Sequence, residues 1–266
     1  MDIDIQNLDA ASYLRKRKDK SINTFLVSCP YGQILKYQGF KFDFEPIADE
    51  MARTLANGGC ILWNEFDQQR NFDFSGDSFR HALYFQSLGL SFCEQVVIEK
   101  NAFVYPRRGY GIGFTNHEYM WVFSKNRPKL INPIVDRPNR KAGKLGEGTN
   151  RRAEDESTVR SGKPYVIQPY GKRGSVWRYE VGGGKTGADG IKHPGKMNLQ
   201  LAIDALKTWG GNPSKSVCAD ICLGSGTTGV AAKVLGFKNF LGCDVSEEYC
   251  KIAKKRIKTA NMLLLK

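Results

Sequence analysis

The 266-residue sequence is short of acidic residues and has no long hydrophobic run. Its 40 Lys and Arg outnumber 27 Asp and Glu, which gives a formal net charge of +13 at pH 7. No apolar run approaches the ~20 residues that a membrane-spanning helix needs. The polar, acidic start from Met1 to Gln6 also lacks the features of a signal peptide. The composition therefore argues against a membrane protein and favours a polyanionic partner, with nucleic acid ahead of a membrane surface.

Histidine is scarce, with three residues, and the seven cysteines form no metal-binding or disulfide pattern. The cysteine count is odd and most cysteines sit within apolar runs, which is typical of reduced, buried thiols in a cytoplasm. Cys218 and Cys222 are four residues apart without a nearby histidine or a second cysteine pair. We therefore expect no metal site.

The most informative stretch runs from Val217 to Asp244. It opens with small and apolar residues, which are typical of a buried parallel strand. The apolar spacing at 230–235 is typical of a helix packed on that strand, and a second strand is expected over 240–244. The intervening turn, Gly224-Ser225-Gly226, has glycines where the backbone must bend and a ligand must approach closely. The stretch predicts a ligand-binding unit of strand, glycine turn, helix and strand.

The acid that ends this unit indicates what the ligand is. Asp244 lies 18 residues after Gly226, close to the ~20-residue spacing of an acid that binds ribose hydroxyls. The pair indicates a nucleoside ligand. A nicotinamide cofactor and S-adenosylmethionine both satisfy the pattern, because Gly224, Gly226 and Gly229 formally match a dinucleotide fingerprint. A nicotinamide enzyme usually opens its sheet with this unit, whereas here the rest of the sheet must come from upstream sequence.

Upstream, strands and helices alternate in the manner of a doubly wound sheet. The turn Ser28-Cys29-Pro30-Tyr31 follows an expected strand, so it is a candidate site, because ligands bind at the carboxyl edge of parallel strands. The expected strands are 22–27, 60–63, 92–99 and 117–123, and the expected helices are 10–15, 46–56 (stopped by Asn57-Gly58-Gly59), 78–88, 199–209 and one capped by Ser246 that buries Tyr249, Ile252, Ala253 and Ile257.

Two segments break this alternation and are basic. The segment 101–116 mixes Arg107, Arg108 and Tyr110 with glycines, which suits either a loop that grips phosphates and bases or a plain solvated loop. The segment 125–189 is rich in Lys, Arg, Gly and Pro and predicts short strands and loops without a large core. It is either a nucleic-acid recognition region or a disordered linker.

Taken together, five motifs resemble those of the beta-class amino-group DNA methyltransferases, in that family's order: Ser28-Cys29-Pro30-Tyr31, Gly58-Gly59, His117-Glu118-Tyr119, His193-Pro194-Gly195-Lys196, and Asp220 through Thr228. The resemblance covers nearly the whole chain. It implies an α/β fold with a doubly wound, mostly parallel sheet of the S-adenosylmethionine-dependent methyltransferase type, a circularly permuted motif order and a basic irregular insertion. The family places Pro at the position of Cys29 and Pro-Phe at those of Ile221 and Cys222.

The resemblance also implies domains, partners and location. Residues 1–125 would form the catalytic half of the methyltransferase domain, 126–190 the target-recognition insertion and 191–266 the cofactor-binding half. The substrate would be double-stranded DNA, with no membrane partner, and the protein a monomer or homodimer in the cytoplasm of a bacterial or phage-infected host cell. The expected cofactor contacts are Asp220, Cys222, Leu223, Gly224, Ser225, Gly226, Thr227, Thr228, Asp244, Val245, His193 and Lys196, and the expected DNA contacts are Arg107, Arg108, Tyr110, Lys172, Arg173 and Arg178.

The chemistry of the family implies the roles of the tetrapeptide. An exocyclic amino nitrogen is a poor nucleophile, and the target base must leave the base stack of the duplex before the enzyme can reach it. Ser28 Oγ and the carbonyl of Cys29 would accept the amino hydrogens, while Tyr31 would stack on the base. Ser28 favours N4 of cytosine, since cytosine members commonly have Ser there. Four alternatives remain. The target atom could be N6 of adenine, or the substrate could be RNA or a protein glutamine side chain. The protein could instead be a degenerate methyltransferase that only binds DNA or cofactor, or Cys29 could act as a covalent nucleophile.

Overall fold

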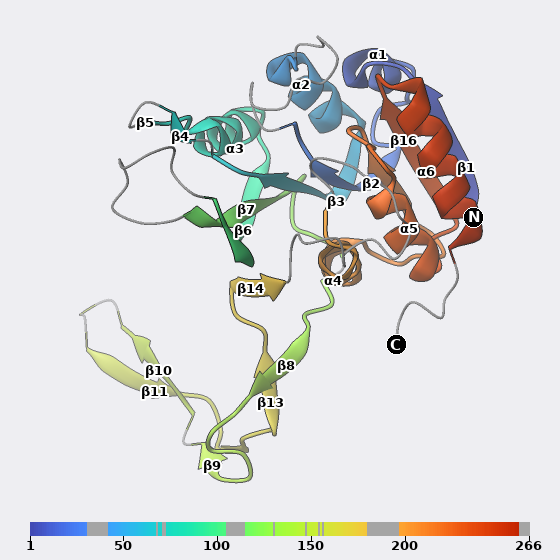
Figure 1. Ribbon diagram of the computed structural model, residues 1–266. Coiled ribbons are helices and arrows are strands. Elements are labelled where there is room, and N and C mark those ends of the chain that lie inside the picture. The colour runs from blue at the N-terminus through green and yellow to red at the C-terminus, as the bar shows by residue number, and fades with distance from the viewer. Residues whose placement is uncertain are drawn as a thin grey trace. The chain divides into compact units, whose positions relative to one another are not determined.

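A single mixed sheet forms the centre of the fold in the computed structural model (Figure 1). The model describes residues 1–30, 42–67, 69–70, 73–104, 115–129, 131–146, 148–153, 155, 157–179 and 197–260. Two compact units are present: Met1–Asn132 with Ser175–Lys266, which contains the sheet, and Pro133–Gly174. Within the described residues, no helix is both long and apolar enough to cross a membrane.

The strands of the sheet lie in the order β1-β16-β15-β2-β3-β7-β6-β14. Only β7 runs antiparallel to its neighbours, β3 and β6, while all other neighbouring pairs are parallel. Their bounds are β1 Asp2–Asn7, β2 Ile22–Ser28, β3 Leu55–Glu65, β6 Ser91–Val104, β7 Thr115–Ser124, β14 Val176–Tyr179, β15 Val217–Asp220 and β16 Asn239–Asp244. A short pair, β4 Gln69–Arg70 and β5 Asp73–Phe74, lies outside the sheet.

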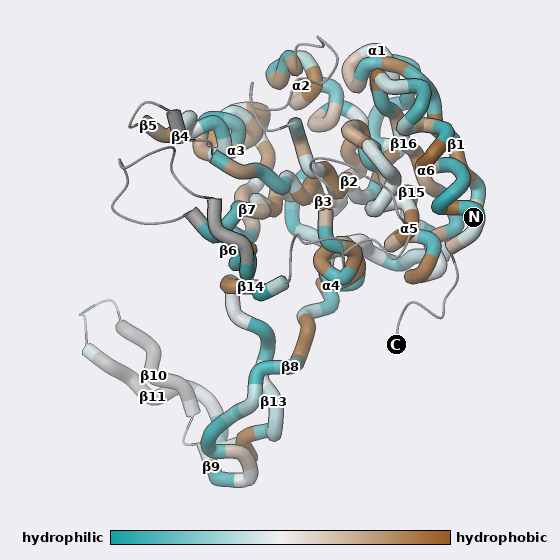
Figure 2. Tube along the Cα trace, in the orientation of Figure 1, coloured by the Kyte–Doolittle hydropathy of each residue, from teal (hydrophilic) through white to brown (hydrophobic). Residues whose placement is uncertain are grey.

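Helices cover both faces of this sheet (Figure 1). On one face are α1 Ala10–Arg15, α2 Phe44–Thr54 and α3 Asp77–Ser87, and on the other α4 Leu199–Trp209, α5 Thr227–Val234 and α6 Glu247–Thr259. Polar caps begin three of them, because the side chains of Asp9, Asn198 and Ser246 accept backbone N–H groups of the first turns of α1, α4 and α6. Hydrophobic and hydrophilic residues fall on different parts of the turns of α4 and α6 (Figure 2), which is why these helices pack on the sheet.

The core under α1, α2 and α3 is strongly aromatic. Trp63 of β3 and Phe85 of α3 are fully buried, and Phe44 of α2 packs edge-on against both at ring distances of 5.4 and 5.3 Å. Burial of each large aromatic ring contributes about 1.5–3 kcal/mol. This core fixes the end of β3 relative to α2 and α3.

The unit Pro133–Gly174 is one long hairpin, which we call the arm. Its strands pair in nested antiparallel fashion, and none of its described side chains is buried. The pairs are β8 Val135–Pro138 with β13 Tyr170–Lys172, β9 Leu145–Gly146 with β12 Tyr165–Val166, and β10 Thr149–Arg152 with β11 Thr158–Ser161. The arm therefore has no hydrophobic core of its own among these residues.

The predicted elements are largely confirmed, with four differences. The strand β1 was not expected, and α2 ends at Thr54 rather than at the glycines, because β3 already begins at Leu55. Strand β6 extends to Val104 and β7 starts at Thr115, so the expected loop 101–116 is shorter at both ends. In α6 the buried residues are Cys250, Ala253 and Ile257, while Tyr249 and Ile252 are half-buried.

Gly226 at the start of α5 provides a test of this packing. Its φ of +83° disfavours a side chain, and an added Cβ would lie 2.7 Å from Ala253 Cβ. Gly236 is a matched control, with a φ of +82° and no heavy atom within 4 Å of an added Cβ. Gly236→Ala should lower the free energy of unfolding by about 1 kcal/mol through backbone strain alone. Gly226→Ala should lower it by about 2–4 kcal/mol, because overpacking adds to the strain. Urea unfolding measures both, and equal losses would contradict the close contact between α5 and α6.

Candidate active site

The chain reverses direction across the sheet between two neighbouring strands, β15 and β2. From β15 it continues through α5 to β16 on one side, and from β2 through α2 to β3 on the other. In open α/β sheets, ligands bind at such a switch point, outside the carboxyl ends of the strands. Ser28 ends β2 and Asp220 ends β15, so the structure brings the two motifs predicted from sequence to this one edge.

The glycine turn after β15 is held by hydrogen bonds at both ends. Leu223 N donates to Cys243 O at 3.1 Å, and Gly226 N donates to Leu223 O at 2.8 Å. Arg256 of α6 donates to the carbonyl and to the hydroxyl of Ser225. Gly224 and Gly226 both have positive φ, at +48° and +83°. Hydrogen bonds at both ends therefore fix the shape of the turn, in which Gly224 to Gly226 are buried.

Asp244 at the end of β16 links the turn to the next helix. Its Oδ2 accepts Gly224 N at 2.7 Å, and its Oδ1 accepts Ser246 N at 2.9 Å. Burial raises the pKa of this carboxyl, while the two backbone amides lower it. Each carboxylate oxygen has a second lone pair, so Asp244 can still accept hydrogen bonds from ribose hydroxyls.

Asp220 is a deeply buried acid, with 4% of its surface exposed. Its Oδ1 accepts Cys222 N at 3.1 Å, and within the described part of the chain it forms no ion pair with Lys or Arg. Burial raises its pKa to about 7, helped by the nearby Asp244 and opposed by hydrogen bonds from Thr228 and Cys222. A cation bound at this edge would stabilise the charged carboxylate.

The start of the tetrapeptide is anchored to β3. Cys29 N donates to Asn64 O at 3.3 Å, and Cys29 Sγ donates to the same carbonyl at 3.6 Å. Burial and the neighbouring Glu65 raise the pKa of the Cys29 thiol well above its usual range. Such a thiol is a poor source of thiolate, which weighs against Cys29 as a nucleophile. Ser28 and Pro30 are half-buried beside it, and Tyr31 lies outside the described residues.

Buried polar residues on β3 and β7 lie beside this turn. Glu118 of β7 belongs to the His117-Glu118-Tyr119 motif, whereas the sequence patterns missed Asn64 and Glu65 of β3. On one side of the sheet, Glu65 accepts Trp63 Nε1 at 3.0 Å, with His81 Nδ1 2.8 Å from the same carboxylate oxygen. On the other side, Asn64 Nδ2 donates to Glu118, which forms an ion pair with Lys100. The only available signal was the presence of polar residues at the end of an otherwise apolar strand, 60–65.

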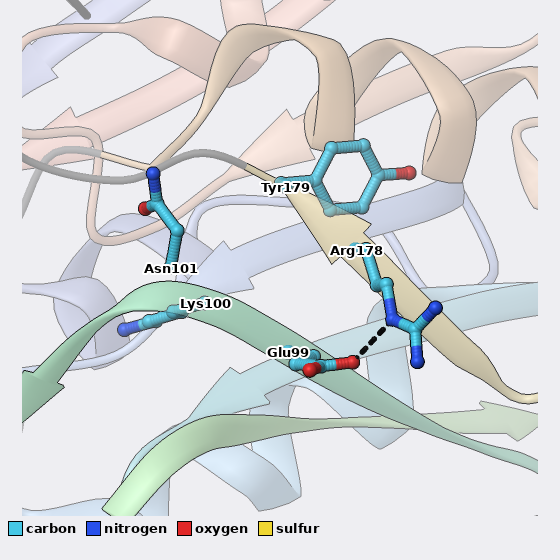
Figure 3. A pocket seen from close by; sticks show the side chains of 5 residues that line it. All are labelled: Glu99, Lys100, Asn101, Arg178 and Tyr179. Carbon is cyan, nitrogen blue, oxygen red and sulfur yellow. Dashed lines mark hydrogen bonds and ion pairs between the residues drawn. The ribbon is translucent and has the colours of Figure 1, made fainter.

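The expected DNA contacts are spread over both units. In the arm, Lys172 is exposed and Arg173 pairs with Asp136 through Nε at 2.9 Å. On β14, Arg178 pairs with Glu99 at 2.5 Å and lines a pocket with Lys100, Asn101 and Tyr179 (Figure 3). Both arginines are thus partly neutralised by acids. The structure does not describe Arg107, Arg108, Tyr110, His193 or Lys196.

The sequence matches a known family over most of its length. The pattern of the N6/N4 DNA methylase family matches residues 20–255. The orphan methyltransferase M.BamHII of Bacillus amyloliquefaciens is 34% identical over 245 residues, which cover 90% of each chain. The type II methyltransferase M1.MboII of Moraxella bovis is 28% identical over 260 residues, which cover 92% of each chain.

Solved structures share the fold. PvuII DNA methyltransferase, described as cytosine-N4-specific, has a TM-score of 0.65 at 15% identity, and the match covers 96% of this chain and 86% of that one. A DNA modification methylase of Thermus thermophilus, complexed with S-adenosyl-L-methionine, has a TM-score of 0.59 at 19% identity, with 96% and 92% covered. The predicted fold class is confirmed.

The raised pKa of Asp220 predicts how stability depends on pH. A carboxyl whose folded pKa lies above its unfolded value of 3.8 favours folding while protonated, and this contribution is lost as pH rises from about 4 to about 7. The free energy of unfolding of Asp220→Asn should therefore equal that of the wild type near pH 4. At pH 8 it should be higher than that of the wild type by roughly 2–4 kcal/mol. Urea unfolding across this range measures the difference. The exposed Asp2→Asn serves as control, and a pH-independent difference for Asp220→Asn would contradict the assignment.

Proposed function

The chain belongs to the N6/N4 DNA methylase family, and from this premise we propose that it transfers a methyl group from S-adenosylmethionine to the exocyclic N4 of cytosine in double-stranded DNA. The observation that carries the proposal is the switch point, which sets Ser28 on β2 beside the glycine turn after β15. A methyl acceptor held at the end of β2 and a methyl donor held at the end of β15 would meet at one edge of the sheet. This proximity supplies much of the acceleration of a transfer between two bound substrates.

The residues of the turn fit S-adenosylmethionine. Asp244 would bind the ribose hydroxyls, and the glycine turn from Gly224 to Gly226 would lie along the methionine portion. The buried carboxyl of Asp220 would face the positive charge of the cofactor, whose sulfonium supplies an activated methyl group. Cys222, Leu223, Thr227, Thr228 and Val245 remain predicted contacts, as do His193 and Lys196.

The tetrapeptide would act on the target amino group. Ser28 Oγ and the carbonyl of Cys29 would each accept one amino hydrogen, which makes the nitrogen pyramidal and aims its lone pair at the methyl group. Reaching this position requires the base to be flipped out of the duplex. The choice of cytosine rests on Ser28 at the head of the tetrapeptide, with N6 of adenine as the alternative. Tyr31 remains the predicted stacking partner.

Nucleoside analysis tests the proposal directly. Mixed-sequence duplex DNA incubated with the protein and S-adenosylmethionine is digested to nucleosides and analysed by mass spectrometry, with a reaction lacking cofactor as control. We expect N4-methylcytosine. N6-methyladenine would keep the reaction and overturn the base assignment. Unmodified DNA, together with measurable cofactor binding, would favour the degenerate binder that the departures at Cys29, Ile221 and Cys222 suggest.

Ser28→Ala tests the role of the hydroxyl. It removes one acceptor for the amino hydrogens, so the single-turnover rate of methyl transfer should fall at least 100-fold, in line with other positioned acid-base groups. The dissociation constant of S-adenosylmethionine, measured by calorimetry, should change less than threefold. Ser87→Ala, at the exposed end of α3, is the matched control. Wild-type activity in Ser28→Ala would remove Ser28 from the mechanism.

The arm is the proposed DNA-reading element. It carries ten Lys and Arg against five Asp and Glu, and hydrophobic side chains such as Leu145, Tyr165 and Tyr170 are more than half exposed on it. Basic residues contact phosphates, and exposed apolar and aromatic groups contact bases. Because none of the arm side chains that the structure describes is buried, these groups are accessible to a duplex.

Deleting the arm separates DNA binding from cofactor binding. Pro138 and Tyr170 are paired across the hairpin, so residues 139–169 can be replaced by two glycines without displacing the strands at the base. Affinity for mixed-sequence duplex DNA should fall at least tenfold in a fluorescence titration, because phosphate contacts are lost. The affinity for S-adenosylmethionine should stay within twofold. Unchanged DNA affinity would show that the arm is not the interface.

A further inference from the structure

An exposed ion pair lies on the last two strands at one side of the sheet. Arg178 of β14 is the register partner of Glu99 on β6, and its Nε donates to Glu99 Oε2 at 2.5 Å. The side chain of Arg178 is 80% exposed and that of Glu99 is 36% exposed. Exposed ion pairs of this kind contribute little to stability. The two side chains are therefore available for binding without cost to the fold.

Glu99 fixes the direction of the Arg178 guanidinium group. Among the described residues, Glu99 is the one that receives a hydrogen bond from the Arg178 side chain, and Figure 3 shows both terminal nitrogens on the far side of the group from Glu99. These two nitrogens carry four N–H groups in a planar fork. Glu99 Oε1 accepts no hydrogen bond from a described residue, so one acceptor remains beside the fork. The pair thus presents two donor groups and one acceptor.

This set of groups matches the edge of one kind of base pair. In the major groove a G·C pair displays two acceptors, guanine N7 and O6, followed by a donor, cytosine N4–H. An A·T pair displays an acceptor, a donor and an acceptor, so adenine N6–H would face a donor of the fork. Arg bound to guanine through two hydrogen bonds and Glu accepting from cytosine N4 are both recurrent contacts in protein–DNA complexes. The Arg178–Glu99 pair is therefore complementary to G·C and not to A·T.

The local charges favour a base over a phosphate. Glu99 balances the charge of Arg178, and Glu118 balances that of Lys100, which also lines the pocket. A phosphate at the fork would be repelled by the Glu99 carboxylate, whereas the edge of a guanine is neutral. The fork is thus better suited to a base edge than to the DNA backbone.

The pair lies toward the same edge of the sheet as the tetrapeptide. Strands β2, β3, β6 and β14 run in one direction, so their carboxyl ends meet at this edge. Four strand spacings of ~4.8 Å separate β2 from β14, which is a distance of about 19 Å. Successive base pairs are ~3.4 Å apart along the duplex axis. A base pair at Arg178 would therefore lie within about six pairs of the flipped base.

We propose that the Arg178–Glu99 pair reads a G·C base pair in the major groove near the target, with the Arg178 fork on guanine N7 and O6 and Glu99 Oε1 on cytosine N4. This role rests on the proposed function and adds to it two residues that determine the sequence recognised. Arg178 follows the last residue of the arm, Gly174, by four positions. Residues that read the DNA sequence are therefore expected on β14 as well as on the arm.

Mapping of the methylated positions in a mixed-sequence duplex library tests the proposal. The wild-type site should contain at least one fixed G·C pair, besides that of the target, within about six pairs of the target. Arg178→Ala should lower the preference for G·C at one such pair at least tenfold and leave the other positions unchanged. Arg178→Gln should move the preference at that pair toward A·T, because a glutamine amide matches adenine N6 and N7. Arg80→Ala is the matched control, since Arg80 is also exposed and paired with an acid, Asp77, and it should keep the wild-type site.

Glu99→Ala separates base reading from phosphate binding. If Arg178 bound a phosphate, removal of the neighbouring acid would tighten DNA binding and leave the recognised site unchanged. We expect the opposite, namely weaker binding to a duplex that carries the wild-type site and a relaxed preference at the same pair as in Arg178→Ala. A uniform loss of DNA affinity in Arg178→Ala, with the slope of log affinity against log salt reduced by about one and no change in base preference, would overturn the proposal.

Binding measurements separate this role from folding and from the proposed function. Where a variant methylates too little DNA for mapping, fluorescence titration of two duplexes that differ only at this pair gives the same preference as a ratio of affinities. The dissociation constant of S-adenosylmethionine should stay within threefold of the wild-type value in every variant, because both residues lie outside the cofactor turn. Wild-type protein that methylates no DNA would refute the proposed function. Wild-type methylation at sites without such a G·C pair, or an Arg178→Ala variant that keeps the wild-type site, would refute only the role of the Arg178–Glu99 pair.

Discussion

A buried carboxyl that forms no ion pair in the described part of the chain, Asp220, is the constraint on which the site depends. It ends β15 at the switch point of the sheet, the place where ligands bind in open α/β folds. Burying such a group destabilises the empty protein once the group is charged. A positive ligand bound at this edge would offset that cost. The neighbouring Asp244 raises the pKa of Asp220 further. Two acids therefore lie close together at this edge, where both would interact favourably with a cation.

The acceptor side of the site is built differently. The family has proline where this chain has Cys29, and proline would stiffen the turn through its ring but could not donate a backbone hydrogen bond. Here the N–H and the thiol of Cys29 both bond to the carbonyl of Asn64, so hydrogen bonds to β3 supply the stiffness. The side chain of the same residue is fixed by Glu118 of β7. Asn64 of β3 thus connects the backbone of the tetrapeptide to β7.

Local patterns predicted most elements that carry a strong period or a cap. Helix α4 was placed over 199–209 because its apolar spacing is regular, and α6 because Ser246 caps it. Strand β1 was missed because its polar sequence shows little burial and its pairing partner, β16, is more than 230 residues away. The start of β3 at Leu55 likewise depends on its partner Ile22 in β2, and this pairing overrides the helical pattern. Gly224 and Asp244 were predictable from spacing, whereas the link from Asn64 to Glu118 spans 54 residues and has no local signal.

The most direct test of the account is the proton balance of cofactor binding. At pH 6.5 the Asp220 carboxyl should be largely protonated in the free protein and charged once the cationic cofactor is bound, so binding should release a proton. Calorimetric titration with S-adenosylmethionine in two buffers of different ionisation enthalpy measures this release. We expect the wild type to release more than half a proton per cofactor and Asp220→Asn to release close to none. Equal release by both proteins, or none by the wild type, would contradict the claim that Asp220 receives the charge of the cofactor.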